Sequence, residues 1–450
     1  MTLPKPPYHR GQGGPFRPLR DFMKDQLTFC QEKIATYGRF FELRLPFRNL
    51  YITTDLAAIR HVLQANQRNY HKSPLYRQLE LPLGKGLLTS EGDFWKKQRR
   101  LAQPAFYKKE LQLLYQKMVE ESERFCRDWK QEIAGKPSVD ISYEMMSITA
   151  DIVLKTLFSS DNKEHRQELY RLMTEAQEYI IDRGMNLFGI PWAYISGRHR
   201  RFLRDREMFD NLIYGMIDER ESSELEWHDL LQLLLESTDV DTGERMNRKQ
   251  LRDEMITLFA AGHETSANAL AWMLYLLAKH PEIQNQLRKE LLESFGGAAP
   301  TMMDLKKVPL LERVVQEVMR LYPPAYAVGR EAQQPDEILG YSIPAKSIVY
   351  ISIYSLHREA EYWEKPNTFW PDHFLPENVK ERPRLAYVPF GAGPRMCIGY
   401  QFAMLEMQIL AALLIQQFSF ELLPGYEAEN QTLITLKPKD GMHLGVKPVV

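Results

Sequence analysis

Cys397 has the clearest potential for chemistry, because it ends a glycine-rich stretch that leads into a predicted helix, VPFGAGPRMCIGYQFA. Backbone N–H groups and the positive end of a helix dipole favour the thiolate form of a cysteine in such a place. Arg395 adds positive charge two residues earlier. Gly391, Gly393 and Gly399 let the backbone approach a flat group closely. A thiolate in this setting suits either a metal ligand or a nucleophile.

The residues around this cysteine favour the first of these roles. A nucleophilic cysteine needs a base, usually His, and none lies near it in the sequence, so only a base brought in by the fold would support that role. A lone thiolate on a glycine-rich loop fits an axial ligand of haem iron. Most lone cysteines are small buried apolar residues. The pattern Phe390-x-x-Gly393-x-Arg395-x-Cys397-x-Gly399 argues against that role here, since five fixed positions arise by chance in about 1 of 10⁴ sequences of this length.

A second candidate site lies in the stretch AGHETS, on a predicted helix from about Asn247 to His280 that Asn247 and Gln250 are expected to begin as an N-cap box. Gly262 weakens a helix, and Thr265 can donate a hydrogen bond to the carbonyl four residues earlier and bend it. A groove of this kind holds a water, and Glu264 beside an alcohol suits proton transfer. The alternative is a surface acid next to a threonine that bonds only to its own helix.

Two further pairs have helical spacing. Glu317 and Arg320 are three residues apart and precede Leu-Tyr-Pro-Pro, so they form either a structural pair or an ordinary exposed ion pair. Trp95 and Arg99 are four residues apart and share a helix face. For this second pair, the alternative to a binding role is a core tryptophan beside a solvated arginine.

Long amphipathic helices must position these residues, because helical periodicity covers most of residues 93–278. Residues 141–158 are apolar nearly all round, which predicts a buried helix. Alternation in RFFELRLPFRNLYIT predicts a hairpin around Pro46–Asn49, and residues 325–354 predict further short strands. A last helix is expected over 398–418, followed by strands. The predicted fold class is mainly α with small β-sheets (α+β).

The remaining segments complete the expected organisation. Residues 1–20 are rich in Pro, Gly and Arg and predict an extended lead-in, after which residues 21–450 form a single catalytic domain. The stretch MNLFGIPWAYISGRHRR breaks the helical pattern with two glycines and a proline. It predicts either a surface loop packed on the core or a mobile lid.

Composition excludes several classes of protein. The 450 residues carry 58 Lys plus Arg against 59 Asp plus Glu, which argues against nucleic acid as the main partner. Three cysteines far apart predict no disulfide framework and a reducing, cytoplasmic location. The first residues lack a signal-like apolar region, and no apolar run of roughly 18 residues occurs, so no membrane anchor is expected. Glycine motifs for nucleotide phosphates are absent from the sequence.

On these motifs, and on their order along the chain, the sequence resembles the cytochrome P-450 superfamily over roughly residues 20–450. The resemblance implies the triangular helical haem-binding domain of that family and Cys397 as the thiolate ligand of haem b. It also implies that Arg395 contacts a haem propionate and that Phe390 packs near the cysteine. Glu264 and Thr265 are implied to be the catalytic residues that deliver protons to iron-bound dioxygen.

Further roles follow from the same resemblance. Trp95, Arg99, Arg330 and His357 are implied to contact propionates. Ala261 stands where some lipid hydroxylases carry a haem-linked glutamate, so a non-covalent porphyrin is expected. The complete implied cofactor-binding set is Cys397, Trp95, Arg99, Arg330, His357, Phe390, Arg395, Gly399 and Ala261.

The chain departs from the family at the structural clamp behind the cysteine loop. The clamp consists of Glu317, Arg320 and an arginine from a later Pro-x-Arg-Phe segment, but here that segment reads PDHF, with His373 in place of the arginine. Imidazole offers at most two donors against five for guanidinium. We therefore expect a weaker or differently bonded clamp.

The substrate pocket is expected to be mostly apolar, which predicts a lipophilic substrate such as a fatty acid, retinoid, terpene or steroid-like molecule. Arg77 is a candidate partner for an acidic head group, with a surface arginine as the alternative. By family position, the pocket residues are Tyr76, Leu79, Leu83, Phe259, Ala260, Ala325, Tyr326, Val328 and Ile434.

The function implied is a soluble bacterial-type monooxygenase that uses O₂ and two electrons to hydroxylate or epoxidise its substrate. No flavin or ferredoxin domain is fused in the sequence, so a separate ferredoxin or flavodoxin with its reductase is expected. Lys96, Lys97 and Arg100 are candidates for docking it, with a solvated helix face as the alternative. The competing hypotheses are a peroxygenase or isomerase that needs no redox partner, and a haem-binding sensor or carrier without turnover.

Overall fold

The computed structural model describes residues 4–9, 17–45, 48–159, 168–169, 171–172, 175–176, 179–180, 193–224 and 227–449. The chain divides into two compact units, each assembled from separate stretches of sequence. One unit comprises Met1–Pro74, Gln316–Cys397 and Asn430–Lys437. The other comprises Leu75–Val315, Ile398–Glu429 and Pro438–Val450. We call them the sheet unit and the helical unit.

The sheet unit is built on a six-stranded sheet with the order β1-β2-β3-β9-β6-β4. The predicted hairpin is confirmed, because β2 and β3 pair antiparallel with Phe41 opposite Ile52. Phe41 and Leu43 pack on one face and Phe40 and Tyr51 on the other, so both faces are covered. The strands are β1 Tyr8–His9, β2 Phe40–Arg44, β3 Asn49–Thr53, β4 Tyr70–Lys72, β6 Ala327–Ala332 and β9 Ile348–Ser352.

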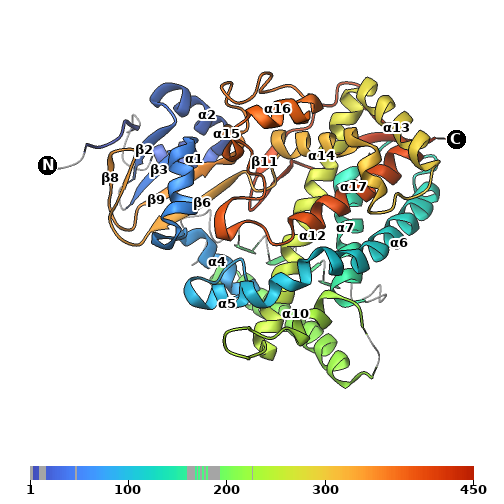
Figure 1. Cartoon of the computed structure of the whole chain (residues 1–450), viewed down its shortest axis with the longest axis horizontal. Helices are drawn as coiled ribbons and strands as arrows, with labels where there is room; N and C mark the ends of the chain where they lie inside the picture. The colour runs from blue at the N-terminus through green and yellow to red at the C-terminus, as the bar shows by residue number, and fades with distance from the viewer. Residues whose placement is uncertain are drawn as a thin grey trace. The chain divides into compact units, whose positions relative to one another are not determined.

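Short helices pack around this sheet, and α2 lies against β2 (Figure 1). Residues 17–37 form two helices, because Asp25 interrupts them and caps the second by accepting a hydrogen bond from the Thr28 backbone N–H. The first helix begins at Arg17, so the end of the expected extended lead-in is helical instead. The helices are α1 Arg17–Lys24, α2 Gln26–Tyr37, α3 Leu56–Arg60, α15 Ile353–Leu356 and α16 Pro376–Glu381. Two small hairpins pair β7 Asp336–Ile338 with β8 Tyr341–Ile343, and β11 Asn430–Thr432 with β12 Leu436–Pro438.

The helical unit is organised around α12, Arg248–Lys279, which packs against α7 and α17 (Figure 1). The predicted N-terminal box is confirmed, because Asn247 and Gln250 bond reciprocally to each other's backbone N–H groups. The predicted buried helix is α7, Ile141–Phe158. A Cβ added at Gly262 would lie 3.2 Å from a methyl of Val153, so this glycine allows α7 and α12 to pack closely.

Other helices and a small sheet complete this unit. The expected C-terminal strands are confirmed, since β10, β13 and β5 form a three-stranded sheet in that order. The helices are α4 Pro74–Leu83, α5 Gly92–Ala102, α6 Lys108–Glu132, α10 Arg198–Ser222, α11 Leu230–Glu236, α13 Pro281–Phe295 and α17 Tyr400–Gln417, and α14 Pro309–Leu321 continues into the sheet unit. The strands are β5 Val139–Asp140, β10 Phe418–Leu422 and β13 His443–Pro448.

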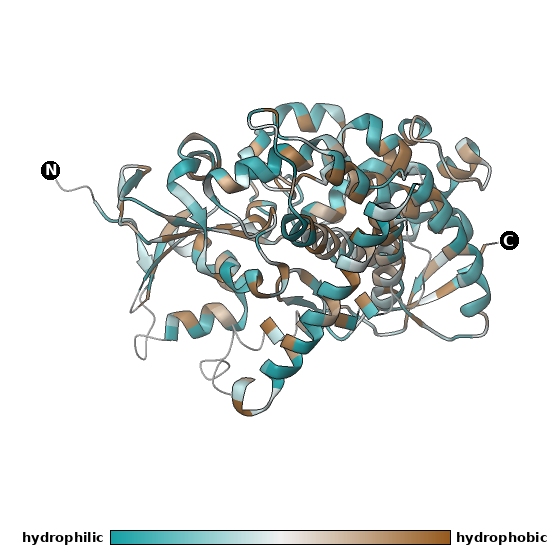
Figure 2. Ribbon diagram, turned by 90° about the horizontal axis from the view of Figure 1, so that it is seen from below, coloured by the Kyte–Doolittle hydropathy of each residue, from teal (hydrophilic) through white to brown (hydrophobic). Residues whose placement is uncertain are grey.

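Most helices carry both hydrophilic and hydrophobic residues along their length (Figure 2). Among the described residues, no helix combines the length and apolar character that crossing a membrane requires. The segment predicted as either a packed loop or a lid lies largely outside the described residues, which resume at Ala193.

Candidate active site

The cysteine loop of the sheet unit is held by its own backbone. The Cys397 N–H donates to the Phe390 carbonyl at 2.9 Å, and the Gly391 N–H donates to the Val388 carbonyl at 3.0 Å. The Met396 N–H closes a third turn by donating to the Gly393 carbonyl at 3.0 Å. These bonds fix the loop, while Cys397 itself is exposed.

Glycine is needed at one position of this loop for a specific steric reason. Gly393 has φ of 70°, and a Cβ there would lie 1.9 Å from the Leu63 carbonyl oxygen. A larger residue would therefore push the loop off the segment His61–Ala65. The glycine at this position therefore allows the cysteine loop to contact the segment His61–Ala65 closely.

The other two cysteines are unsuited to reactive roles. Cys30 and Cys126 are buried, and burial raises the pKa of each thiol to about 12. The exposed thiol of Cys397 lies on a glycine-containing loop close to Arg395 in the sequence. A sulfur atom in such a place is what haem iron needs as an axial ligand. The residues present therefore fit the implied cofactor.

Behind this loop lies a fully buried ion pair, which excludes the exposed alternative. Arg320 donates to both carboxylate oxygens of Glu317, at 2.7 and 2.8 Å, and neither side chain is accessible. The same guanidinium also donates to the carbonyls of His357, Pro366 and Thr368, at 2.7–2.9 Å. Since every donation reaches a backbone or carboxylate acceptor, the pair ties α14 to the irregular segment that precedes the cysteine.

His373 takes the place of the family's arginine in this clamp with different bonds. Its Nδ1 lies 3.1 and 3.2 Å from the two oxygens of Glu317, and its Nε2 accepts from the Lys365 N–H at 3.5 Å. A neutral imidazole with its proton on Nδ1 satisfies both contacts. Arg382 adds a cation nearby, because its guanidinium bonds to the His373 carbonyl and lies over the ring of Trp363 at 3.7 Å. Burial lowers the pKa of Arg382 to about 10. The sequence motifs gave no indication that this residue lies in the clamp.

His357 holds the start of the cysteine loop. Its side chain is fully buried, and its Nε2 accepts from the Val388 N–H at 2.9 Å. Burial and the charges of Arg320 and Arg358 lower its pKa well below the usual value, so the ring is neutral. Its Nδ1 is buried without a hydrogen-bond partner among the described residues, and the expected propionate contact stays a prediction.

Five further predicted residues of the sheet unit, Arg330 and four pocket residues, occupy strands and loops of this unit. Arg330 lies on β6 and is mostly buried, with its guanidinium donating to the Gly329 carbonyl at 3.0 Å. Tyr326 donates to the Leu433 carbonyl at 3.0 Å, which brings the loop that carries Ile434 next to residues 324–326. Ile434 and Ala325 are exposed there, whereas Val328 belongs to the core. The structure thus groups three of the four predicted pocket residues from this unit.

In the helical unit, the acid–alcohol pair lies on α12 as expected. The Thr265 hydroxyl donates to the Ala261 carbonyl at 2.9 Å, which confirms the predicted bond within the helix. Glu264 is mostly buried. His263 lies within the core, where Nδ1 is 2.8 Å from the Phe259 carbonyl and burial lowers the pKa of the ring. The proton-carrying candidates on this stretch are therefore Glu264 and Thr265.

Two buried acids of α12 hold the loop between α4 and α5, and sequence reasoning missed both. Asp253 accepts from the Lys85 N–H at 2.9 Å, and Glu254 accepts from the Leu87 N–H at 3.0 Å. A Cβ at Gly84 or at Gly86 would lie 2.1 Å from a side-chain oxygen of α12. Two glycines around one lysine, together with paired acids on a buried helix, are the sequence signal that predicts this contact.

On α5, Trp95 is mostly buried, and Arg99 donates to the Gln103 side chain at 2.9 Å. Three cations of this helix were candidates for docking a redox partner, but each has an acidic partner within the chain. Lys96 pairs with Asp93, Lys97 with Glu244, and Arg100 with Asp239 and Asp241. This pairing removes most of the charge excess on which the docking prediction depends.

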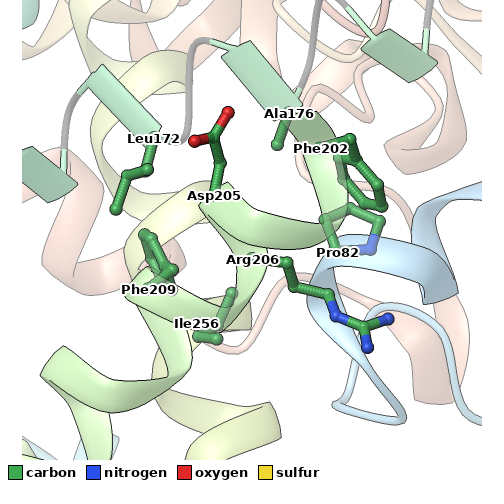
Figure 3. A pocket seen from close by; sticks show the side chains of 8 residues that line it. All are labelled: Pro82, Leu172, Ala176, Phe202, Asp205, Arg206, Phe209 and Ile256. Carbon is green, nitrogen blue, oxygen red and sulfur yellow. The ribbon is translucent and has the colours of Figure 1, made fainter. Parts of the chain in front are cut away.

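A small hollow with about 20 Å³ of free space, room for about one water, lies beside α10 (Figure 3). Six of its eight lining side chains are apolar, and the other two are Asp205 and Arg206. None of the predicted pocket residues lines it. Leu79 packs in a neighbouring cluster with Tyr179 and Phe202, Leu83 and Phe259 are buried, Tyr76 and Ala260 are half-buried, and Arg77 is exposed. The lining residues are Pro82, Leu172, Ala176, Phe202, Asp205, Arg206, Phe209 and Ile256.

Comparisons with known proteins agree with this arrangement. A family model described as cytochrome P450 matches residues 16–444. The chain is 33% identical to cyclooctatin synthase of Streptomyces melanosporofaciens over 92% of this chain and 88% of that protein. It is also 33% identical to cytokinin hydroxylase of Arabidopsis thaliana, over 82% and 73%. The solved structure of retinoic acid bound cyanobacterial CYP120A1 matches all of both chains with a TM-score of 0.84 and 26% identity.

Proposed function

Because this chain belongs to the cytochrome P450 family and is a haem-thiolate monooxygenase, we propose that it oxidises a lipophilic small molecule with electrons from a separate protein. The overall reaction consumes O₂, two electrons and two protons. One oxygen atom enters a C–H bond or a double bond of the substrate, and the other leaves as water. The observation that carries the proposal is the exposed Cys397 thiol on a loop held by glycines and by a buried clamp.

In this family, haem held by a cysteine thiolate activates O₂. The residues of the chain must bind the haem and supply protons. Cys397 is the proposed ligand, and Arg395, Arg330, Trp95 and Arg99 are the proposed propionate partners. Phe390, whose carbonyl holds the cysteine N–H, orients the ligand. Gly399 and Ala261 complete the proposed binding surface. A Cβ at Gly399 would meet the Phe106 ring at 3.7 Å, and Ala261 is exposed on α12.

Proton delivery is proposed for Glu264 and Thr265. The Thr265 hydroxyl donates its own proton to the Ala261 carbonyl, so its oxygen remains an acceptor that can hold a water. Glu264 is the adjacent acid that can exchange protons with that water. An enzyme that only rearranges peroxides has no need of such a pair, and this supports the monooxygenase over the peroxygenase or isomerase.

A lipophilic substrate is supported by the mostly apolar character of the predicted pocket residues. The names of similar proteins agree in kind, since one solved relative holds retinoic acid and another relative is a cyclooctatin synthase. We propose a terpene, retinoid, fatty acid or steroid-like compound for this chain.

The test uses purified haem-loaded protein with a ferredoxin, its reductase and NADPH, supplied with ¹⁸O₂ and a panel of such compounds. We expect a product that carries one ¹⁸O atom and forms only when the electron proteins are present. Product formed from hydrogen peroxide alone, with no ¹⁸O from O₂, would overturn the proposal in favour of a peroxygenase.

A further inference from the structure

We propose that a groove between α6 and α11 binds a small organic cation with an apolar body, at a site that shares no residue with the predicted active site. The groove has about 310 Å³ of free space, which lies within the size range of small-molecule sites. All of its walls belong to the helical unit. The lining residues are Glu110, Leu113, Leu114, Trp227, His228, Gln232, Leu233 and Glu236.

The walls of this groove are fixed by buried bonds, so the space is preformed. Asp229 accepts from both terminal nitrogens of Arg220, at 2.6 and 2.7 Å, and neither side chain is more than 4% accessible. The same carboxylate begins α11 by accepting from the Gln232 N–H at 3.0 Å. Lys117 of α6 donates to the His228 carbonyl and so ties the two walls together. A preformed site avoids the entropy cost of ordering its walls when a ligand binds.

The polar groups of the lining favour a positive charge. Glu110 and Glu236 both line the groove, and neither carboxylate forms an ion pair among the described residues. Gln232 donates to one oxygen of Glu236 at 2.6 Å, which leaves the other oxygen for a ligand. None of the described lining residues is a lysine or an arginine. The nearby cations Lys117 and Arg220 are already bonded to acceptors of the chain.

The rest of the lining suits an apolar body beside that charge. Three leucines contribute aliphatic surface, and Trp227 contributes an aromatic ring. The Arg220 guanidinium lies over this ring at 4.2 Å, so the indole already has a cation on one face. Leu113 is 47% accessible, which leaves part of the aliphatic surface uncovered. A molecule with both a positive charge and an apolar body would cover that surface and approach the carboxylates.

Other classes of ligand fit this lining less well. A carboxylate or a phosphate would meet two like charges and no cation in the described lining. A bare metal ion needs several ligands, and the described residues hold no cluster of three or more His, Cys, Asp or Glu side chains that could supply them. An uncharged lipid would cover the leucines but would gain nothing from the carboxylates.

The test compares three aromatic compounds of similar size on the haem-loaded protein: benzyltrimethylammonium, the uncharged N,N-dimethylbenzamide and the anion benzylsulfonate. A quaternary ammonium has no free electron pair, so it cannot ligate haem iron. Binding is measured by isothermal titration calorimetry, and the haem band is recorded separately. We expect one cation per protein to bind about tenfold more tightly than the amide, as two partly exposed ion pairs give, and the anion not to bind. High salt should weaken the cation, and the haem band should not shift.

Two kinds of variant locate the site. Glu110→Gln combined with Glu236→Gln should weaken the cation about tenfold. Glu120→Gln should leave its affinity unchanged and is a matched control, because Glu120 is exposed on α6 and accepts from a glutamine four residues earlier, as Glu236 does on α11. Leu113→Trp fills the groove without changing its charge, and this variant should also lose the cation. Melting temperatures show that each variant remains folded.

Equal affinity for the three compounds would overturn the inference, as would a cation affinity that survives in the double glutamate variant or in Leu113→Trp. A cation that shifts the haem band would bind at the predicted active site instead, and this result or a complete lack of binding would also overturn it. The haem-thiolate spectrum and the oxygenated product are measured separately, so none of these outcomes bears on the proposed function.

Discussion

The cysteine loop and the hollow beside α10 show how differently two parts of one enzyme are encoded. Behind the loop, each donation of the buried Arg320 reaches an acceptor, and Gly393 makes a contact that a Cβ would break. The hollow is lined by apolar side chains from segments far apart in sequence, with one buried acid among them. Paired polar groups hold the loop in one geometry, whereas the hollow is formed by mostly apolar side chains that only the fold brings together.

The largest expected effect comes from a substitution in the buried clamp behind the cysteine loop. Glu317→Ala leaves Arg320 buried and unpaired, which costs about 3–5 kcal/mol of unfolding free energy. Urea unfolding followed by circular dichroism measures this loss, and haem content falls with it. Glu312→Ala, at an exposed position of the same helix, serves as the control. Unchanged stability in Glu317→Ala would mean that the clamp does not support the loop.

The next effect is a loss of product formation with no change in protein stability. Thr265→Ala removes the hydroxyl that we propose to hold a proton-carrying water, so product formed per O₂ consumed should fall by about 100-fold. The thiolate spectrum and melting temperature should stay as in the parent, and Thr265→Ser should restore most of the coupling. A variant that remains fully coupled would remove this residue from the proton path.

A smaller effect tests the histidine that replaces the family's arginine. His373→Ala removes one hydrogen bond to the buried Glu317 and should lower the unfolding free energy by about 1–3 kcal/mol. Lys380→Ala, at an exposed site nearby, should change it by under about 0.5 kcal/mol. If both variants are equally stable, Arg382 and the backbone hydrogen bonds stabilise the clamp without the imidazole.

The last effect concerns pH and Glu406, a fully buried acid on α17. Burial raises its pKa from 4.5 to about 8, with Ser266 of α12 as its hydrogen-bonding neighbour. Because the folded state binds this proton more tightly than the unfolded state, stability should fall as pH rises from about 4.5 to about 8. Glu406→Gln should flatten this part of the stability profile. An unchanged profile in melting temperature against pH would contradict the assignment.

The sequence predicted those features that local spacing determines. The capping box of α12, the β2–β3 hairpin and the bond from Thr265 to Ala261 depend on residues close together along the chain. The cysteine loop was found for the same reason. Side chains that meet across elements escaped the prediction, such as the two α12 acids that hold the loop after α4. The complete burial of His357 and its bond to the Val388 N–H cannot be read from a motif either.

The central claim, that Cys397 is the haem ligand of a P450 monooxygenase, is tested most directly by the reduced, carbon monoxide-bound optical spectrum. We expect the purified protein to show the red-shifted band of thiolate-ligated haem, and Cys126→Ala, which changes a buried thiol, to retain it. Cys397→Ala should lose that band while its circular dichroism stays folded. A thiolate band that survives in Cys397→Ala, or that is missing from the unaltered protein after haem loading, would contradict the account.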